Sequence, residues 1–216
     1  MSHIRIALTI FAALGVAACT TAPQPADVVT LSIVGTNDVH GELLPTGDKG
    51  GIVTISAYLN ALRLARDEDG GAVLYIDAGD MWQGTLESNL TEGAFVVDAY
   101  NALGVTAAAI GNHEFDFGPV GMNAIPIDDD DDPRGALKLR ATEADFPLLA
   151  ANLIDLSTGR PVQWDNVQSS VMVEAAGVKV GIIGVLTSRA LQTTISANTP
   201  GLEIAPLAAT VTAEAH

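Results

Sequence analysis

The sequence has 216 residues, enough for one domain with a hydrophobic core, and its charge excludes one large class of partner. It carries 26 Asp and Glu against 10 Lys and Arg, which gives a formal net charge of -16. Binding to a nucleic-acid backbone requires clustered Lys and Arg, which this sequence lacks, so we expect no nucleic acid as a partner. A protein this acidic needs local positive charge to handle an anionic substrate, and bound metal ions are the obvious source.

The first 27 residues have the pattern of an export leader followed by a tether. The apolar run 6–18 is shorter than the roughly 20 residues that span a bilayer, and it fits the hydrophobic part of a signal peptide. It ends in Val-Ala-Ala-Cys, which resembles the lipobox of bacterial lipoproteins. We therefore expect a lipoprotein signal peptide over 1–18, lipidation of Cys19, a tether over 19–27 and a periplasmic or cell-envelope location, with the chain anchored to the membrane by lipid. The alternative is an ordinary secretory signal with an incidental Cys19.

The segment after the tether predicts a βαβ unit. Residues 28–34 are apolar and β-branched, which favours a strand. An apolar stripe at helical spacing follows Gly50 and Gly51 and breaks over 67–71, and residues 72–76 predict a second buried strand. Two strands joined by a helix run parallel, so the residues that follow each strand lie at the same edge of the sheet.

Polar side chains follow both of these strands. Asp38 and His40 come after the first strand and lie two residues apart, so in extended chain they project the same way. Asp80 comes after the second strand. A carboxylate and an imidazole that converge are a typical pair of metal ligands. The alternative for the first group is a loop with an Asx turn at Asn37 or Asp38.

A third strand is expected before the part of the sequence that is richest in functional side chains. Residues 81–89 are expected to form a polar loop, and a helix starting at residue 91 or 92 is expected to bury Phe95, Val96, Ala99 and Leu103 and to end at Gly104. Residues 105–110 then predict a buried strand, and open α/β sheets bind ligands beyond the carboxyl ends of their strands.

The group at this third tip is Asn112, His113 and Asp116. His113 and Asp116 are three residues apart, so the carboxylate can orient the imidazole. Oriented imidazoles serve proton transfer and the stabilisation of transition-state charge. The alternative is an Asn/Gly turn with a solvated His and Asp.

The acidic run 128–132 predicts a solvated surface insertion. Its alternating Asp residues resemble the start of an EF-hand loop, but Pro133 and Leu139 stand where that loop requires Gly and Glu, so a weak divalent-ion site is only the alternative. Further elements are expected at 146–151 (strand), 170–173 with 178–185 (hairpin), and 206–216 (the beginning of a helix).

Taken together, the three tips resemble the calcineurin-like metallophosphoesterase family, and more narrowly its bacterial 5′-nucleotidase group. The motifs are Thr-Asn-Asp-Val-His-Gly-Glu-Leu at 36–43, Asp-Met-Trp-Gln-Gly-Thr at 80–85, and Gly-Asn-His-Glu-Phe-Asp-Phe-Gly at 111–118. The resemblance covers 28–187 apart from the acidic insertion near 125–140. It implies an α/β fold, an α/β/β/α sandwich incomplete at the C-terminus, of which 28–216 form the N-terminal part.

The resemblance also implies a metal-dependent hydrolase with two divalent ions, of Mn, Zn, Fe or Co. Asp38 and His40 are expected to bind the first metal, Asp80 to bridge both, and Asn112 to bind the second. His113, oriented by Asp116, is expected to act as the catalytic group that stabilises charge on the phosphoryl group or the leaving oxygen.

In such a hydrolase a water activated by two metals attacks phosphorus in line, and the implied substrate is a small phosphoester, specifically a nucleotide. Asp77 and Glu114 are expected to support the loops by hydrogen bonds and not to bind metal. Alternative chemistries with the same motifs are a 2′,3′-cyclic phosphodiesterase, a sugar-nucleotide hydrolase and a thiosulfohydrolase.

The sequence departs from the family pattern in its histidines. The family has further metal-binding His residues later in its catalytic domain, whereas the four here are His3, His40, His113 and His216. The C-terminal domain that holds the nucleoside in the 5′-nucleotidase group has no counterpart either. We therefore expect an N-terminal piece of a longer protein, and the alternative is a truncated, catalytically incomplete domain that binds at most one metal.

Overall fold

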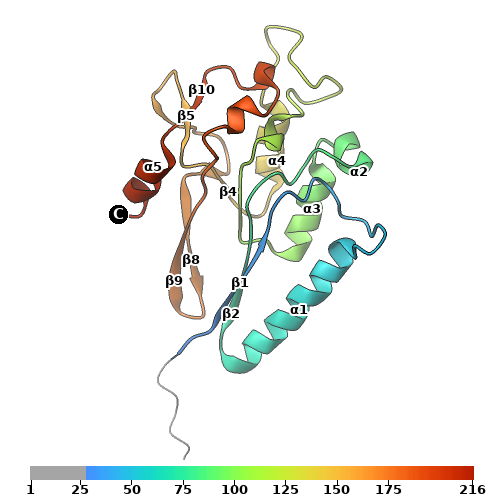
Figure 1. Ribbon diagram of the computed structural model, residues 1–216, viewed down its shortest axis with the longest axis vertical. Coiled ribbons are helices and arrows are strands. Elements are labelled where there is room, and N and C mark those ends of the chain that lie inside the picture. The colour runs from blue at the N-terminus through green and yellow to red at the C-terminus, as the bar shows by residue number, and fades with distance from the viewer. Residues whose placement is uncertain (1–27) are drawn as a thin grey trace, which may run out of the picture.

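The computed structural model describes residues 28–216, and its centre is a parallel sheet (Figure 1). The predicted leader, Cys19 and tether lie outside the described residues. The sheet has five strands in the order β1-β2-β3-β4-β7, and every neighbouring pair is parallel. The strands are β1 Leu31–Thr36, β2 Ala72–Asp77, β3 Ala107–Ala109, β4 Leu148–Leu149 and β7 Val167–Gln168.

Helices cover one face of this sheet (Figure 1). The longer ones are α1 Gly51–Asp69, α3 Ala94–Leu103 and α4 Gly135–Glu143, and a short helix, α2 Leu86–Leu90, precedes α3. The main core lies between helices and sheet, and its largest fully buried side chains include Leu59, Tyr75, Trp82, Tyr100 and Phe115. No helix within residues 28–216 is both long and apolar enough to cross a bilayer.

A second β layer lies against the opposite face. The hairpin β8 Ser170–Ala175 and β9 Val178–Ile183 packs near β2, and Ile182 and Ile183 share a cavity with Ala107–Ala109 of the central sheet. A small antiparallel sheet, β10 Leu202–Ile204, β5 Leu153–Asp155 and β6 Arg160–Pro161, and helix α5 Leu207–Glu214 complete the described chain. The expected α/β class with a parallel sheet is confirmed.

Two local predictions are wrong, and one helix was not predicted. Residues 81–89 are not a polar loop, because Met81 and Trp82 are buried and Thr85 caps helix α2 by accepting a hydrogen bond from Ser88 N at 3.4 Å. Phe95 is 42% exposed and does not belong to the buried stripe of α3, which consists of Val96, Val97, Tyr100 and Leu103. Helix α4 was not expected at all, because its first half lies in the predicted acidic insertion.

Strand and helix ends also shift by a few residues. Helix α1 continues to Asp69 and ends at Gly70, whose left-handed backbone (φ 72°) forms the C-cap, so it does not break at residue 67. The third strand is confined to Ala107–Ala109, because only those residues pair with β2 and β4.

Candidate active site

The loops that leave β1 and β2 run side by side at the carboxyl edge of the sheet. Asp38 N donates to Gly79 O at 3.0 Å, and His40 N donates to Asp80 O at 3.0 Å. These bonds continue the parallel pairing of the two strands beyond their ends. They therefore fix the positions of Asp38, His40 and Asp80 relative to one another.

The loop after β3 joins the other two through close backbone contact. A Cβ atom at Gly79 would lie 2.7 Å from Gly111 N, and one at Gly111 would lie 2.6 Å from Asp80 N. Glycine is required at both positions because any side chain would separate the loops. Asp80 Oδ1 also accepts a hydrogen bond from His113 N at 2.9 Å, which connects the second tip to the third.

Four residues in these loops have a left-handed backbone that side chains rarely adopt. The φ angles are 50° at Asp38, 49° at His40, 57° at Asp80 and 52° at Gln83. Such conformations cost on the order of 1–3 kcal/mol each and gather at functional sites, where the surrounding structure holds them. The strain thus coincides with three of the predicted metal ligands.

The three tips surround one cavity of about 360 Å³, which Asp38, Asp80 and Asn112 line together. Side-chain ligand atoms of His40, Asp80 and His113 lie within 4.8 Å of one another, and the two imidazole rings meet edge to face with centroids 4.8 Å apart. The structure therefore brings together all the residues that the sequence placed at the three strand ends.

Hydrogen bonds orient both imidazoles. His40 Nδ1 lies 2.7 Å from the carbonyl oxygen of Gln83, and because a carbonyl only accepts, Nδ1 carries the proton and Nε2 is free to bind a metal. His113 Nδ1 lies 2.6 Å from Asp116 Oδ2. Asp116 Oδ1 in turn accepts a hydrogen bond from Thr194 Oγ1 at 2.7 Å, so the orienting carboxylate is itself held.

The buried carboxylate of Glu114 holds the loops after β2 and β3 together. Its two carboxylate oxygens accept hydrogen bonds from the backbone N–H groups of Asp80 (2.9 Å), Met81 (2.8 Å), Trp82 (3.4 Å) and Gly111 (2.6 Å). Burial, together with the smaller effect of the Asp80 charge, raises the pKa of Glu114 to about 7, although the backbone donors oppose both effects. Glu114 is therefore a support for the loops, as expected from the sequence.

Asp77, at the end of β2, supports the site in the same way. It accepts hydrogen bonds from Gly79 N at 2.8 Å and from Tyr100 Oη at 2.9 Å, and Thr36 also donates to it. Burial raises its pKa above the usual value for Asp. Asp77 therefore holds the base of the loop, and it is not among the residues that line the cavity of Asp38, Asp80 and Asn112.

The chemistry of the donor set fits divalent cations. Carboxylate and amide groups line the cavity, and the imidazoles of His40 and His113 lie close to Asp80. None of the ion pairs within residues 28–216 gives Asp38, Asp80 or Glu114 a Lys or Arg partner. Carboxylates gathered without a cation create a field that favours a bound metal. The His40, Asp80 and His113 cluster is a site that a metal can occupy.

Individual roles at this site stay predictions. Asn112 Nδ2 donates to Thr193 O at 3.1 Å, which leaves its amide oxygen free for a ligand role. Asp38 is exposed, and its Oδ1 lies 4.0 Å from His40 Nε2. His113 lies close enough to Asp80 and His40 to bind metal as well as to act on substrate, whereas the sequence suggested only the second role.

The sequence predicted that Asp116 orients His113, but it did not predict the contacts that hold His40, Asn112 and Asp116 themselves. Gln83 acts through its backbone carbonyl, which any residue type would provide, so nothing in its identity signals the role. Thr193 and Thr194 lie about 80 positions further along the chain and reach the site through the loop after β9. Only the fold brings them near Asn112 and Asp116.

Comparisons with known proteins agree with the fold and the site. No family model matches the chain. The 5′-nucleotidase of Diplobatis ommata is 31% identical over 162 residues, which are 71% of this chain and 25% of that protein. The 5′-nucleotidase of Vibrio vulnificus is 29% identical over 189 residues, 85% of this chain and 31% of that protein.

A solved structure gives the same correspondence in three dimensions. The 5′-nucleotidase precursor from Thermus thermophilus superposes with a TM-score of 0.66 at 27% identity, over 85% of this chain and 33% of that one. The chain thus spans between a quarter and a third of the length of these proteins.

Proposed function

Because the chain belongs to the 5′-nucleotidase family, as part of its N-terminal metallophosphoesterase domain, we propose that it supplies the metal-binding site of a hydrolase that removes phosphate from nucleotides. The observation that supports this most directly is the meeting of Asp38, Asp80 and Asn112 around one cavity, beside the close group of His40, Asp80 and His113. The relatives are nucleotidases by name, and each name refers to a protein longer than this chain. The nucleotide substrate is therefore part of the proposal.

We assign two divalent ions to the cavity. Asp38 and His40 would hold one, Asn112 would hold the other, and Asp80 would lie between them. When bound, such ions activate water and neutralise charge on a phosphoryl group. We propose that each ion is Mn, Zn, Fe or Co, because oxygen and nitrogen donors suit all four metals.

The residues of the chain have separate tasks in this proposal. Asp116 keeps the proton of His113 on Nδ1, so Nε2 faces the reacting group as an acceptor in the neutral imidazole and as a donor in the imidazolium. His113 then stabilises charge that develops on the phosphoryl group or on the leaving oxygen. Asn112 presents an amide oxygen, which ligates without adding negative charge that would repel phosphate.

The test is phosphate release from adenosine 5′-monophosphate by the purified chain, first as prepared, then after chelation, and then with added Mn²⁺, Zn²⁺ or Co²⁺. We expect chelation to abolish release and one of the metals to restore it. Elemental analysis of the same samples distinguishes two bound ions from a single ion or none, the result expected of a catalytically incomplete domain. No release from any nucleotide under these conditions would contradict the proposal.

We further propose that the protein is held at the cell envelope by lipid on Cys19. The basis is the leader pattern of residues 1–18 and the position of Cys19 directly after it. Incorporation of labelled palmitate into the wild-type protein, and its loss in Cys19→Ser, would support the anchor. Equal labelling of both proteins would exclude it.

A further inference from the structure

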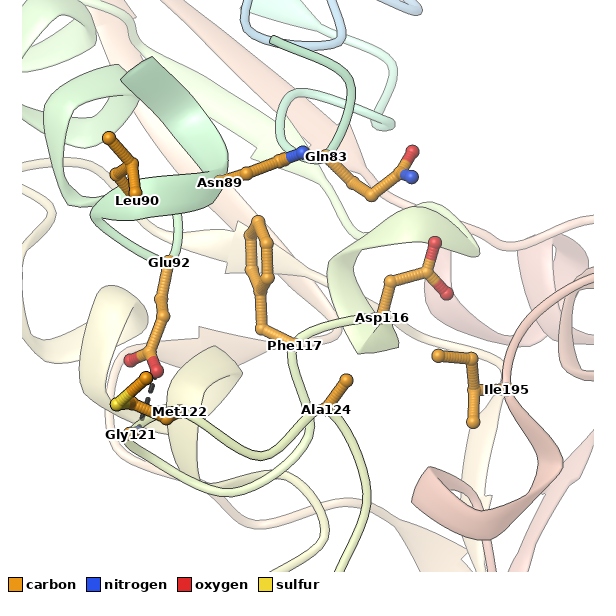
Figure 2. Close-up of a pocket in the computed structure, with 10 residues that line it drawn as sticks. All are labelled: Gln83, Asn89, Leu90, Glu92, Asp116, Phe117, Gly121, Met122, Ala124 and Ile195. Atoms are coloured by element: carbon orange, nitrogen blue, oxygen red, sulfur yellow. Dashed lines mark hydrogen bonds between the residues drawn. The ribbon is translucent and has the colours of Figure 1, made fainter. Parts of the chain in front are cut away.

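Two of the hollows that lie outside the cavity of the predicted metal ligands differ in charge. The pocket in Figure 2 is lined by the carboxylates of Glu92 and Asp116, and Glu92 Oε1 accepts a hydrogen bond from Gly121 N at 2.6 Å. The other hollow, of about 470 Å³, is a groove between α1 and α3, and none of its lining residues is charged. On a protein with a net charge of -16, an uncharged surface is where a second acidic molecule can bind without repulsion.

The exposed side of α1 is uncharged along most of its length. Figure 1 shows this helix at the outside of the molecule. Val53 is 68% exposed and Leu64 is 65% exposed, whereas Leu59 on the opposite side of the helix is fully buried. Between residues 51 and 65 the exposed residues are Val53, Thr54, Ala57, Tyr58, Asn60, Ala61, Leu64 and Ala65. A helix that is apolar on both sides normally packs against a partner on each of them.

Four of these exposed residues form a line that we call the α1 seam: Val53, Ala57, Asn60 and Leu64. Their spacing of four, three and four residues is the a/d spacing by which helices pair in coiled coils. The spacing is the same when the seam is read backwards. Two antiparallel copies of α1 can therefore meet with Val53 of each copy opposite Leu64 of the other. Such a contact offers the same surface from both copies, as a twofold-symmetric interface requires.

The two ends of α1 are complementary in charge. No side chain caps the helix at Gly50 and its first turn contains no acidic residue, so the positive end of the helix dipole is uncompensated. Asp67 and Glu68 lie in the last turn, at the negative end, and neither forms an ion pair within the described part of the chain. In the antiparallel register set by the seam, Asp67 lies level with Gly50 of the second copy. Glu68 lies level with Lys49 of the second copy, whose side chain is 65% exposed.

The groove between α1 and α3 enlarges the surface that a second helix can contact. Three seam residues line it together with small residues of α3, namely Val53, Ala57, Asn60, Ala99 and Ala102. Alanine side chains let two helices approach closely, so α1 of a second copy can rest against both helices. A contact of this kind lies at the small end of protein interfaces, and we therefore expect dissociation in the micromolar range.

We propose that the α1 seam and the adjoining groove form the interface of a symmetric dimer of this chain, with the two α1 helices antiparallel. The symmetric spacing of the seam and the complementary helix ends select a second copy as the occupant. Two chains of this net charge repel each other through acidic parts of their surfaces, and the uncharged seam avoids that repulsion. The dimer is independent of the proposed function.

Sedimentation velocity of the purified chain at increasing concentration tests the dimer. Wild type should change from monomer to dimer, and Leu64→Glu should raise the dissociation constant by about tenfold or more, because a charge replaces an apolar anchor of the interface. Leu64 is exposed in the monomer and Glu is a good helix former, so circular dichroism should show an unchanged fold. Met172→Glu, at a position of β8 that is 67% exposed, is the matched control and should dimerise like wild type.

An exchange of charges tests the antiparallel register. Val53→Lys and Leu64→Glu should each weaken the dimer when made alone. The double variant should recover most of the association, because each new Lys then faces a new Glu across the interface. In a parallel pair the new charges would meet their own kind, and the double variant would be weaker than either single variant.

Three results would contradict the inference. A wild-type chain that stays monomeric up to millimolar concentration would overturn the dimer. Association that is unaffected by Leu64→Glu would overturn the α1 interface and indicate contact through another part of the chain. A double variant that does not recover association would overturn the antiparallel arrangement. None of these measurements depends on whether the chain hydrolyses nucleotides.

Discussion

Two acidic regions of the molecule are built in opposite ways. At the carboxyl edge of the sheet, Asp38 and Asp80 come from strand ends separated in sequence. Glu114 fixes the loop that presents Asp80, and backbone hydrogen bonds join the Asp38 loop to it. In the run 128–132, five Asp residues are adjacent, and their carboxylates serve their own loop. Asp131 Oδ2 accepts from Ile127 N at 2.8 Å, and Asp132 pairs with Lys138 at 2.7 Å. Of these two regions, only the first brings a carboxylate and two imidazoles into one close group, beside a cavity lined by further polar side chains. The number of acidic residues in a stretch therefore indicates a site less well than the convergence of separate strand ends.

The substitution expected to have the largest effect is Asp80→Asn. It removes the carboxylate that would hold both proposed ions and that lies near His40 and His113. We expect activity to fall by at least about a hundredfold, since even groups that only support metal ligands commonly contribute ten- to a hundredfold. Phosphate release and metal content are measured together. Retained activity with full metal content would remove Asp80 from the centre of the site.

The second-largest effect on activity is expected for His113→Ala. It should slow turnover by about a hundred- to ten-thousandfold, the usual contribution of a positioned imidazole, while the metal content is unchanged. Asp116→Asn should show a smaller decrease in the same direction, because it disturbs only the orientation of His113. Loss of metal in His113→Ala would instead make His113 a ligand, as its distance to His40 and Asp80 permits.

Glu114→Gln tests how firmly the loops must be held. The amide provides one acceptor oxygen where the carboxylate has two, so at least one of four buried or partly buried backbone N–H groups loses its partner. We expect the free energy of unfolding to fall by about 1–3 kcal/mol, the cost of an unsatisfied buried donor. Urea denaturation of the metal-free chain measures it, and a stability equal to wild type would contradict the anchoring role.

Substitutions in the acidic run 128–132 should have little effect on metal content or on the free energy of unfolding. Simultaneous replacement of Asp128, Asp129 and Asp130 by Asn should change the free energy of unfolding by less than about 0.5 kcal/mol and leave metal content unaltered. A loss of bound ion in this variant would revive the weak cation site that the sequence left as an alternative.

The smallest expected effect is a dependence on pH within that run. Backbone N–H groups of Ile127 and Asp128 hold the pKa of Asp131 below its usual value of about 3.9. A lowered folded-state pKa stabilises the fold above the unfolded pKa, and this stabilisation is lost as the pH falls through the folded value. The melting temperature of wild type should therefore exceed that of Asp131→Asn at pH 7, and the difference should disappear under strongly acidic conditions.

The sequence predicted the site residues that follow parallel strands. It did not predict contacts that depend on the path of later loops. Asp38, Asp80 and Asn112 each follow a strand, so parallel pairing alone placed them at one edge. Thr194 reaches Asp116 from 78 positions away, a contact that depends on the path of the chain after β9. Helix α2 was missed because its five residues are too few for a periodic pattern, and only its Thr85 cap signals it.

The left-handed backbone at Asp38, His40 and Asp80 has an evolutionary consequence. Glycine adopts that conformation without penalty, so replacement by glycine would relax the polypeptide at each position while destroying its ability to coordinate. A lineage that no longer needed the chemistry could accept glycine there without backbone strain, so side chains that carry ligand atoms at strained positions are what selection for reactivity would favour.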